Sequence, residues 1–148
     1  MQVYIGADHA GFNLKKRLLH ELGELGMEVF DEGASELNEE DDYPDFIQPV
    51  ARAVSDNPKT VRGIIIGGSG QGEAMAANRF SGVRAAVYYG GPNEIVTLSR
   101  EHNDANVLSL GARFMSEDEG FNVVKLWLKT NFSGDERHKR RIIKIDSY

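Results

Sequence analysis

The 148-residue sequence contains no cysteine, which excludes disulfide bonds, thiolate metal sites and a cysteine nucleophile. Basic residues are outnumbered by acidic ones, and the formal net charge of −6 argues against a surface that binds nucleic acid generally. No apolar run approaches the roughly 20 residues of a membrane-spanning helix, and the N-terminal residues do not have the pattern of a signal peptide. We therefore expect a small cytoplasmic protein whose residues 1–148 form a single domain.

Short apolar segments alternate with longer amphipathic ones along the chain. The segments with the composition of strands are 3–7, 27–31, 62–67, 83–88 and 106–110. Between them lie helical patterns, such as the leucine stripe of residues 14–25, and an acidic segment, 35–42, that has the polarity of an exposed loop. This alternation predicts an α/β domain of three layers with a five-stranded parallel sheet. In such a sheet, ligands bind beyond the carboxyl ends of the strands.

A glycine-rich segment follows the third predicted strand and leads to Glu73. A dinucleotide-binding fingerprint would need glycine at position 73, a P-loop would need lysine there, and a nucleophile elbow at Ser69 would need glycine in place of Gln71. What remains is a loop of Gly68, Ser69, Gly70, Gln71 and Gly72 whose backbone N–H groups can approach an oxyanion, with Glu73 beside it as a base. The alternative is a tight turn with an acidic residue in the first turn of a helix.

Two opposing effects act on the pKa of Glu73. The N-terminus of a helix lowers the pKa of a nearby carboxyl group, whereas burial in a dry pocket raises it. For Glu73 to be a useful general base, burial must raise its pKa at least as much as the helix N-terminus lowers it, and the sequence does not settle which effect dominates.

Polar side chains also stand beside other predicted strands and helix ends. Asp8 and His9 follow the first strand, where they either bind sugar hydroxyls or a phosphate, or form a turn cap and a surface histidine. His102, at the end of the helix after the fourth strand, is either a general acid or base with Asn103 beside it to orient a substrate, or a partner of the helix dipole. Arg113 follows the fifth strand and suits a phosphate or sugar hydroxyls.

The C-terminal segment, about 134–148, is basic and is expected to be helical. Arg137 and Arg141 are four residues apart, so on a helix they share a face and can grip one phosphate together. The alternative is a solvated basic face. No pair of histidine or acidic residues has a convincing metal-binding spacing, so no metal site is predicted.

Taken together and in this order, these segments resemble the type B ribose-5-phosphate isomerases, a family that also includes galactose-6-phosphate and allose-6-phosphate isomerases. The segments that carry the resemblance are 8–11, 42–44, 68–73, 76–78, 100–103 and 137–141. The resemblance implies a Rossmann-like fold without a cofactor or metal. It also implies a homodimer or dimer of dimers whose active sites lie at the subunit interface, with the C-terminal segment at that interface.

The resemblance also implies roles for individual residues. Glu73 would move a proton between C2 and C1, and His102 would open the furanose ring. The remaining residues would bind the substrate or its phosphate: Asp8, His9, Gly68, Ser69, Gly70, Gln71, Gly72, Asn103, Arg113, Arg137 and Arg141. Some of the three arginines would come from the neighbouring subunit. Many members of the family have a cysteine base at the end of the third strand, where this chain has Gly67, and the chain resembles the branch that carries a glutamate instead.

The leading hypothesis is therefore an aldose–ketose isomerase that interconverts ribose 5-phosphate and ribulose 5-phosphate through a cis-enediolate. An isomerase of a six-carbon sugar 6-phosphate remains an alternative, because the depth of the pocket decides between the two. A non-catalytic module that binds a sugar phosphate is the alternative from another class. In each case the expected partner is a phosphorylated sugar, with no nucleic acid and no membrane.

Overall fold

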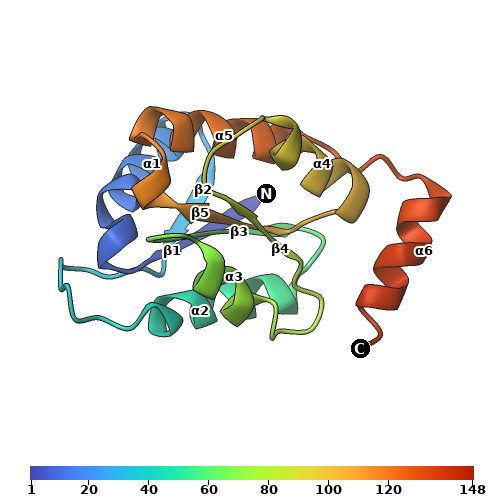
Figure 1. Cartoon of the computed structure of the whole chain (residues 1–148), viewed down its shortest axis with the longest axis horizontal. Coiled ribbons are helices and arrows are strands. Elements are labelled where there is room, and N and C mark those ends of the chain that lie inside the picture. The colour runs from blue at the N-terminus through green and yellow to red at the C-terminus, as the bar shows by residue number, and fades with distance from the viewer.

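The computed structural model describes residues 1–148 and has a five-stranded parallel sheet between two layers of helices (Figure 1). The strands are β1 (Gln2–Ala7), β2 (Glu28–Asp31), β3 (Val61–Gly67), β4 (Ala85–Tyr88) and β5 (Val107–Gly111). Along β3, Ile64 and Ile66 pack into one core cluster, whereas Ile65 packs into the other on the opposite face. The isoleucine run therefore marks a strand buried on both faces, and the predicted α/β fold is confirmed.

Helices cover both faces of the sheet. One face is covered by α1 (Phe12–Glu24), α4 (Glu94–Asn103) and α5 (Glu117–Lys129), and the other by α2 (Tyr43–Asp56) and α3 (Gln71–Ala77) (Figure 1). Two single-turn 3-10 helices, η1 (His9–Gly11) and η2 (Ala112–Phe114), follow β1 and β5 directly. None of the helices combines the length and the apolar composition that crossing a membrane requires.

The strand order is β2-β1-β3-β5-β4, so the chain turns outward in opposite directions from the neighbouring strands β1 and β3. A crevice forms at such a switch point, beyond the carboxyl ends of the two strands. Ala7 pairs with Ile66 in the parallel register, which brings the residues after β1 beside the glycine-rich segment after β3. The fold thus places two of the predicted polar segments at one point.

The last helix, α6 (Glu136–Ile145), confirms the predicted helical C-terminus and stands apart from the two layers (Figure 1). It contacts α4 through stacked rings of His102 and His138, and its end is held by an ion pair of 3.0 Å between Arg84 and Asp146. Most of its side chains remain exposed, including Ile143. Its place in the fold therefore depends on few contacts within its own chain.

Candidate active site

Glu73 lies in the first turn of α3 and is buried, with 4% of its surface exposed. Its carboxylate lies against the backbone of Gly67, so closely that a Cβ atom at position 67 would collide with Oε1. The lack of a side chain at Gly67 therefore makes the room in which the Glu73 carboxylate sits. This room is at the carboxyl end of β3, beside the crevice.

Burial dominates the pKa of Glu73. Desolvation raises the pKa of this carboxyl group above its ordinary value, and the nearby charge of Asp8 raises it further. The backbone N–H groups of Gly70 and of Glu73 itself pull the pKa down, but less strongly. The structure thus resolves the question that the sequence left open. A carboxylate with a raised pKa is a stronger base toward a carbon-bound proton.

The glycine loop has a conformation that depends on missing side chains. Gly70 has a φ of 77°, and a Cβ atom there would lie 2.9 Å from the carbonyl carbon of Leu110. Ser109 donates a hydrogen bond from its hydroxyl to the Gly70 carbonyl, which fixes the loop against β5. A Cβ atom on Gly72 would lie 2.7 Å from the hydroxyl of Tyr43, so this tyrosine covers the first turn of α3. The glycines therefore let neighbouring groups approach the backbone closely.

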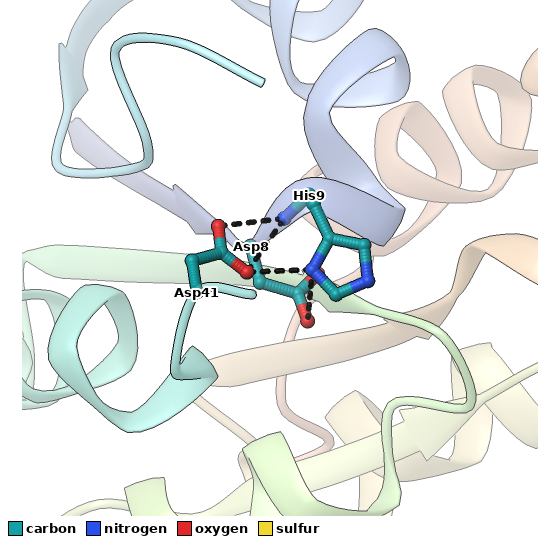
Figure 2. Close-up of side chains that lie close together, drawn as sticks. All are labelled: Asp8, His9 and Asp41. Carbon is teal, nitrogen blue, oxygen red and sulfur yellow. Dashed lines mark hydrogen bonds and ion pairs between the residues drawn. The ribbon is translucent and has the colours of Figure 1, made fainter. Parts of the chain in front are cut away.

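Three side chains gather at the end of β1 (Figure 2). Asp8 caps η1, because its Oδ1 accepts hydrogen bonds from the backbone of Ala10 at 2.9 Å and of Gly11 at 3.3 Å. His9 Nδ1 lies 2.6 Å from Oδ1 of Asp41, and the backbone N–H of His9 donates to Oδ2 of Asp41 at 3.0 Å. The hydrogen bond to Asp41 is the main cause that raises the pKa of His9.

The same three residues place one ligand atom each within 4.8 Å of one another, a spacing that a metal site can also have. However, Asp8 Oδ1 accepts two backbone hydrogen bonds, and His9 Nδ1 is bound to Asp41. A metal ion would have to displace the His9–Asp41 hydrogen bond. Hydrogen bonding alone therefore accounts for the geometry of the cluster.

Arg113 lies in η2 on the other side of the glycine loop. Its backbone N–H donates to the carbonyl of Gly68 at 3.2 Å, and a Cβ atom on Gly68 would lie 3.2 Å from one guanidinium nitrogen. The exposed guanidinium has no carboxylate partner within the chain and acts on the pKa of His9, which it lowers. Arg113 and His9 therefore lie along one rim of the site, where they can donate hydrogen bonds to a ligand.

Four of the predicted site residues lie elsewhere. His102 and Asn103 end α4, which runs antiparallel to the strands and so reaches the amino edge of the sheet, opposite Glu73. Arg84, directly before β4, donates to the Asn103 carbonyl at 3.1 Å, which fixes this location. Arg137 and Arg141 are exposed on α6, near His102. The chain thus brings together Asp8, His9, residues 68–73 and Arg113, but not His102, Asn103, Arg137 and Arg141.

Two residues near the site were not identified as functional from the sequence. The acidic segment 35–42 has the polarity of an exposed loop, and Asp41 departs from this expectation because only 8% of its side chain is exposed. Five acidic residues in one short segment look alike, and no periodicity distinguishes the one that turns inward. Tyr43 is part of the segment 42–44, which carries the family resemblance and directly follows Asp41, and this segment is the signal that could have directed attention to both residues.

The chain is similar to known proteins along its whole length. The family described as Ribose/Galactose Isomerase matches residues 3–145. A ribose-5-phosphate isomerase B of Mycobacterium tuberculosis is 40% identical over 100% of this chain and 90% of its own length. A crystal structure of ribose-5-phosphate isomerase B from Mycoplasma genitalium with bound ribulose-5-phosphate superposes with a TM-score of 0.95 at 41% identity, covering 99% and 95% of the two chains. The enzyme from Clostridium thermocellum gives a TM-score of 0.91 at 44% identity, covering 99% and 96%.

Proposed function

The chain belongs to the ribose/galactose isomerase family, and from this membership we propose that it interconverts ribose 5-phosphate and ribulose 5-phosphate. It is an aldose–ketose isomerase of sugar phosphates. The relatives named above are ribose-5-phosphate isomerases, and one of them holds ribulose-5-phosphate in its crystal structure. The observation that carries the proposal is the buried Glu73 carboxylate, which occupies the room left by Gly67 beside the crevice.

Glu73 is the proposed base. In the direction of the ketose, its carboxylate takes the proton from C2 of the open-chain aldose, and the electron pair of the C–H bond forms the cis-enediolate. The protonated carboxyl group then returns the proton to C1, while the proton of the O2 hydroxyl passes to O1, so that C2 becomes the carbonyl carbon and C1 carries the hydroxyl group. Since burial raises the pKa of Glu73, protonation of this carboxylate in the intermediate costs less than it would in water. Backbone N–H groups of residues 68–72 are the proposed donors for the developing oxyanion.

The other proposed groups divide between two copies of the chain. The sheet separates Glu73 from His102, and β3 alone, with seven residues, spans about 20 Å. A five-carbon sugar phosphate is much shorter than this, so it cannot contact both edges of one chain. We therefore assign Asp8, His9 and Arg113 to one copy in each site. His102, which opens the ring, and Asn103, Arg137 and Arg141 come from a second copy in a two-fold symmetric dimer.

The surface between the two half-sites supports this arrangement. Two hollows of about 550 and 560 Å³ lie along α3 and the outer edge of β4, and both are lined by Asn78, Arg79 and Ala85. One hollow reaches Gln71 beside the glycine loop, and the other reaches Asn103. Met75 on α3 is 68% exposed at this face. A second copy seated here would cover the apolar surface and bring its own α4 and α6 toward the first copy's crevice.

The substitution Glu73→Gln tests the proposed base. We expect the variant to bind ribose 5-phosphate within a few-fold of the unchanged protein but to lose about 100- to 10,000-fold in kcat, because general-base catalysis contributes on this order. Loss of C2 deuterium exchange, followed by proton NMR in heavy water, should parallel the loss in kcat.

Glu117→Gln is the matched control, because Glu117 is also a glutamate in the first turn of a helix but is exposed. Its kcat should equal that of the unchanged protein. Near-normal turnover of the Glu73→Gln variant would show that another group takes the C2 proton.

A further inference from the structure

Asp41 differs from the other acidic residues of its loop. Glu36, Glu39, Glu40 and Asp42 are exposed, whereas the Asp41 side chain turns inward to the end of β1 and is 8% exposed. Both of its carboxylate oxygens contact His9, one through the ring nitrogen Nδ1 and the other through the backbone N–H. An aspartate whose two carboxylate oxygens both bind one residue fixes the position of that residue and places a negative charge beside it.

The contact determines which nitrogen of His9 can meet a ligand. Nδ1 is held 2.6 Å from Asp41, and Figure 2 shows the other ring nitrogen, Nε2, turned away from Asp41. The His9 side chain is 23% exposed, and the hydrogen bond of Nδ1 to Asp41 leaves Nε2 as the ring nitrogen that can meet a ligand. With Nδ1–H donated to Asp41, a proton on Nε2 makes the ring an imidazolium that can donate to an anion.

Charged groups from three elements face the His9 ring. Asp41 and Asp8 favour the protonated ring, with Asp8 Oδ2 3.9 Å from Nδ1, whereas Arg113 in η2 and partial burial oppose it. The hydrogen bond to Asp41 is the largest of these effects, and the pKa of His9 is raised. Without Asp41, the histidine would therefore lose its proton more readily, because a second cation, Arg113, faces it.

We propose that Asp41 is a positioning residue that holds His9 as an imidazolium, with Nε2–H directed to an anionic oxygen of the sugar phosphate. His9 and Arg113 then present two cationic donors to one ligand, which suits a phosphate dianion or an enediolate oxygen. This inference rests on the proposed function, since the ligand is that of the same site. It adds a residue that no substrate atom needs to touch.

The substitution Asp41→Asn removes the charge but keeps an oxygen that can accept from the His9 backbone. In an NMR titration of the His9 ring, assigned by comparison with His9→Gln, we expect the pKa of His9 to fall in the variant. The ratio of kcat/KM between the variant and the unchanged protein should be near one at pH 6. It should fall about tenfold by pH 8, because a charge-assisted hydrogen bond contributes about that factor. The ratio cancels the titration of Glu73, which both proteins share.

Three further variants separate positioning from a structural role. Asp41→Glu retains the charge and should retain the pH dependence of the unchanged protein, whereas Asp42→Asn alters an exposed neighbour and should have no effect. In a His9→Gln background, Asp41→Asn should leave the pH dependence of kcat/KM unchanged. Inorganic phosphate, used as a competitive inhibitor, identifies the ligand oxygen: weaker inhibition in Asp41→Asn assigns His9 to the phosphate, and a loss confined to kcat assigns it to the enediolate.

An unchanged His9 titration, or a kcat/KM ratio that is constant from pH 6 to pH 8, would overturn the proposal and leave Asp41 with a structural role only. The titration needs no turnover, so this result is distinguishable from failure of the proposed isomerase activity. That failure would appear as an absence of ribulose 5-phosphate formation by the unchanged protein.

Discussion

At the scale of single residues, Gly67 and Glu73 form one functional unit. The carboxylate of Glu73 occupies the volume in which a side chain at position 67 would begin. A side chain at the end of β3 and a buried Glu73 therefore exclude each other. The glutamate in the first turn of α3 can place its carboxylate here only when position 67 is glycine.

The substitution Gly67→Ala should therefore impair catalysis. The added methyl group collides with Oε1 of Glu73 and displaces the carboxylate, and a displacement of about 1 Å costs on the order of 100-fold in kcat. The measurement is kcat in a coupled assay, together with the thermal midpoint to verify folding. Gly23→Ala in α1 is the control, since a Cβ atom there meets nothing within 4 Å. An unchanged kcat in Gly67→Ala would show that the carboxylate does not act from this position.

At the scale of elements, the sequence was informative wherever periodicity or strand geometry applied. The apolar segment 62–67 predicted a strand, which the structure buries on both faces, and the sheet topology then brought the ends of β1 and β3 together. Ser116 caps α5 by accepting a hydrogen bond from the Glu119 backbone, and the Glu119 side chain accepts from the Tyr88 hydroxyl instead of returning to the cap. The inward orientation of the Asp41 side chain could not be predicted, because a loop sequence without periodicity does not indicate which side chains point toward the protein interior.

The helix α6 presents its basic residues on more than one face. Arg137 and Arg141 are four residues apart and share a face, and both are exposed. Lys139 is bound to Glu136 at 2.8 Å, and Arg140 lies next to Arg141 in sequence but about 100° away around the helix. The helix therefore contains a proposed phosphate-binding pair and a second pair of equal charge.

A comparison of two double variants tests the role of this face. Arg137→Gln with Arg141→Gln should lower kcat/KM for ribose 5-phosphate by about 100-fold or more, because two charge-assisted hydrogen bonds to the phosphate are lost. Lys139→Gln with Arg140→Gln removes the same charge from the same helix and should change kcat/KM by less than about threefold. Equal losses in both variants would indicate that α6 acts through its overall charge and not through a phosphate grip.

At the scale of the whole molecule, one chain has half of the proposed site at each edge of its sheet. Neither composition nor periodicity indicates this division, since both report on burial within a chain and not on contacts between chains. His102 is at the end of a helix that returns to the amino edge, and Glu73 is at the carboxyl edge. The family resemblance implied shared sites, and the distance across the sheet supplies the physical reason for them.

Mixing two inactive variants tests whether the sites are shared. The Glu73→Gln chain lacks the base, and the chain with Arg137→Gln and Arg141→Gln lacks the phosphate-binding pair. In a dimer of one chain of each kind, one site contains both defects and the other contains neither. If differently tagged chains are co-expressed and assort at random, about half of the dimers are mixed and have one intact site of two. The preparation should therefore recover about a quarter of the unchanged activity.

Combining Glu73→Gln with Gly67→Ala, which alter the same half-site, should recover none. If the first mixture also stays inactive although mixed dimers are purified through both tags, each site would have to be complete within one chain.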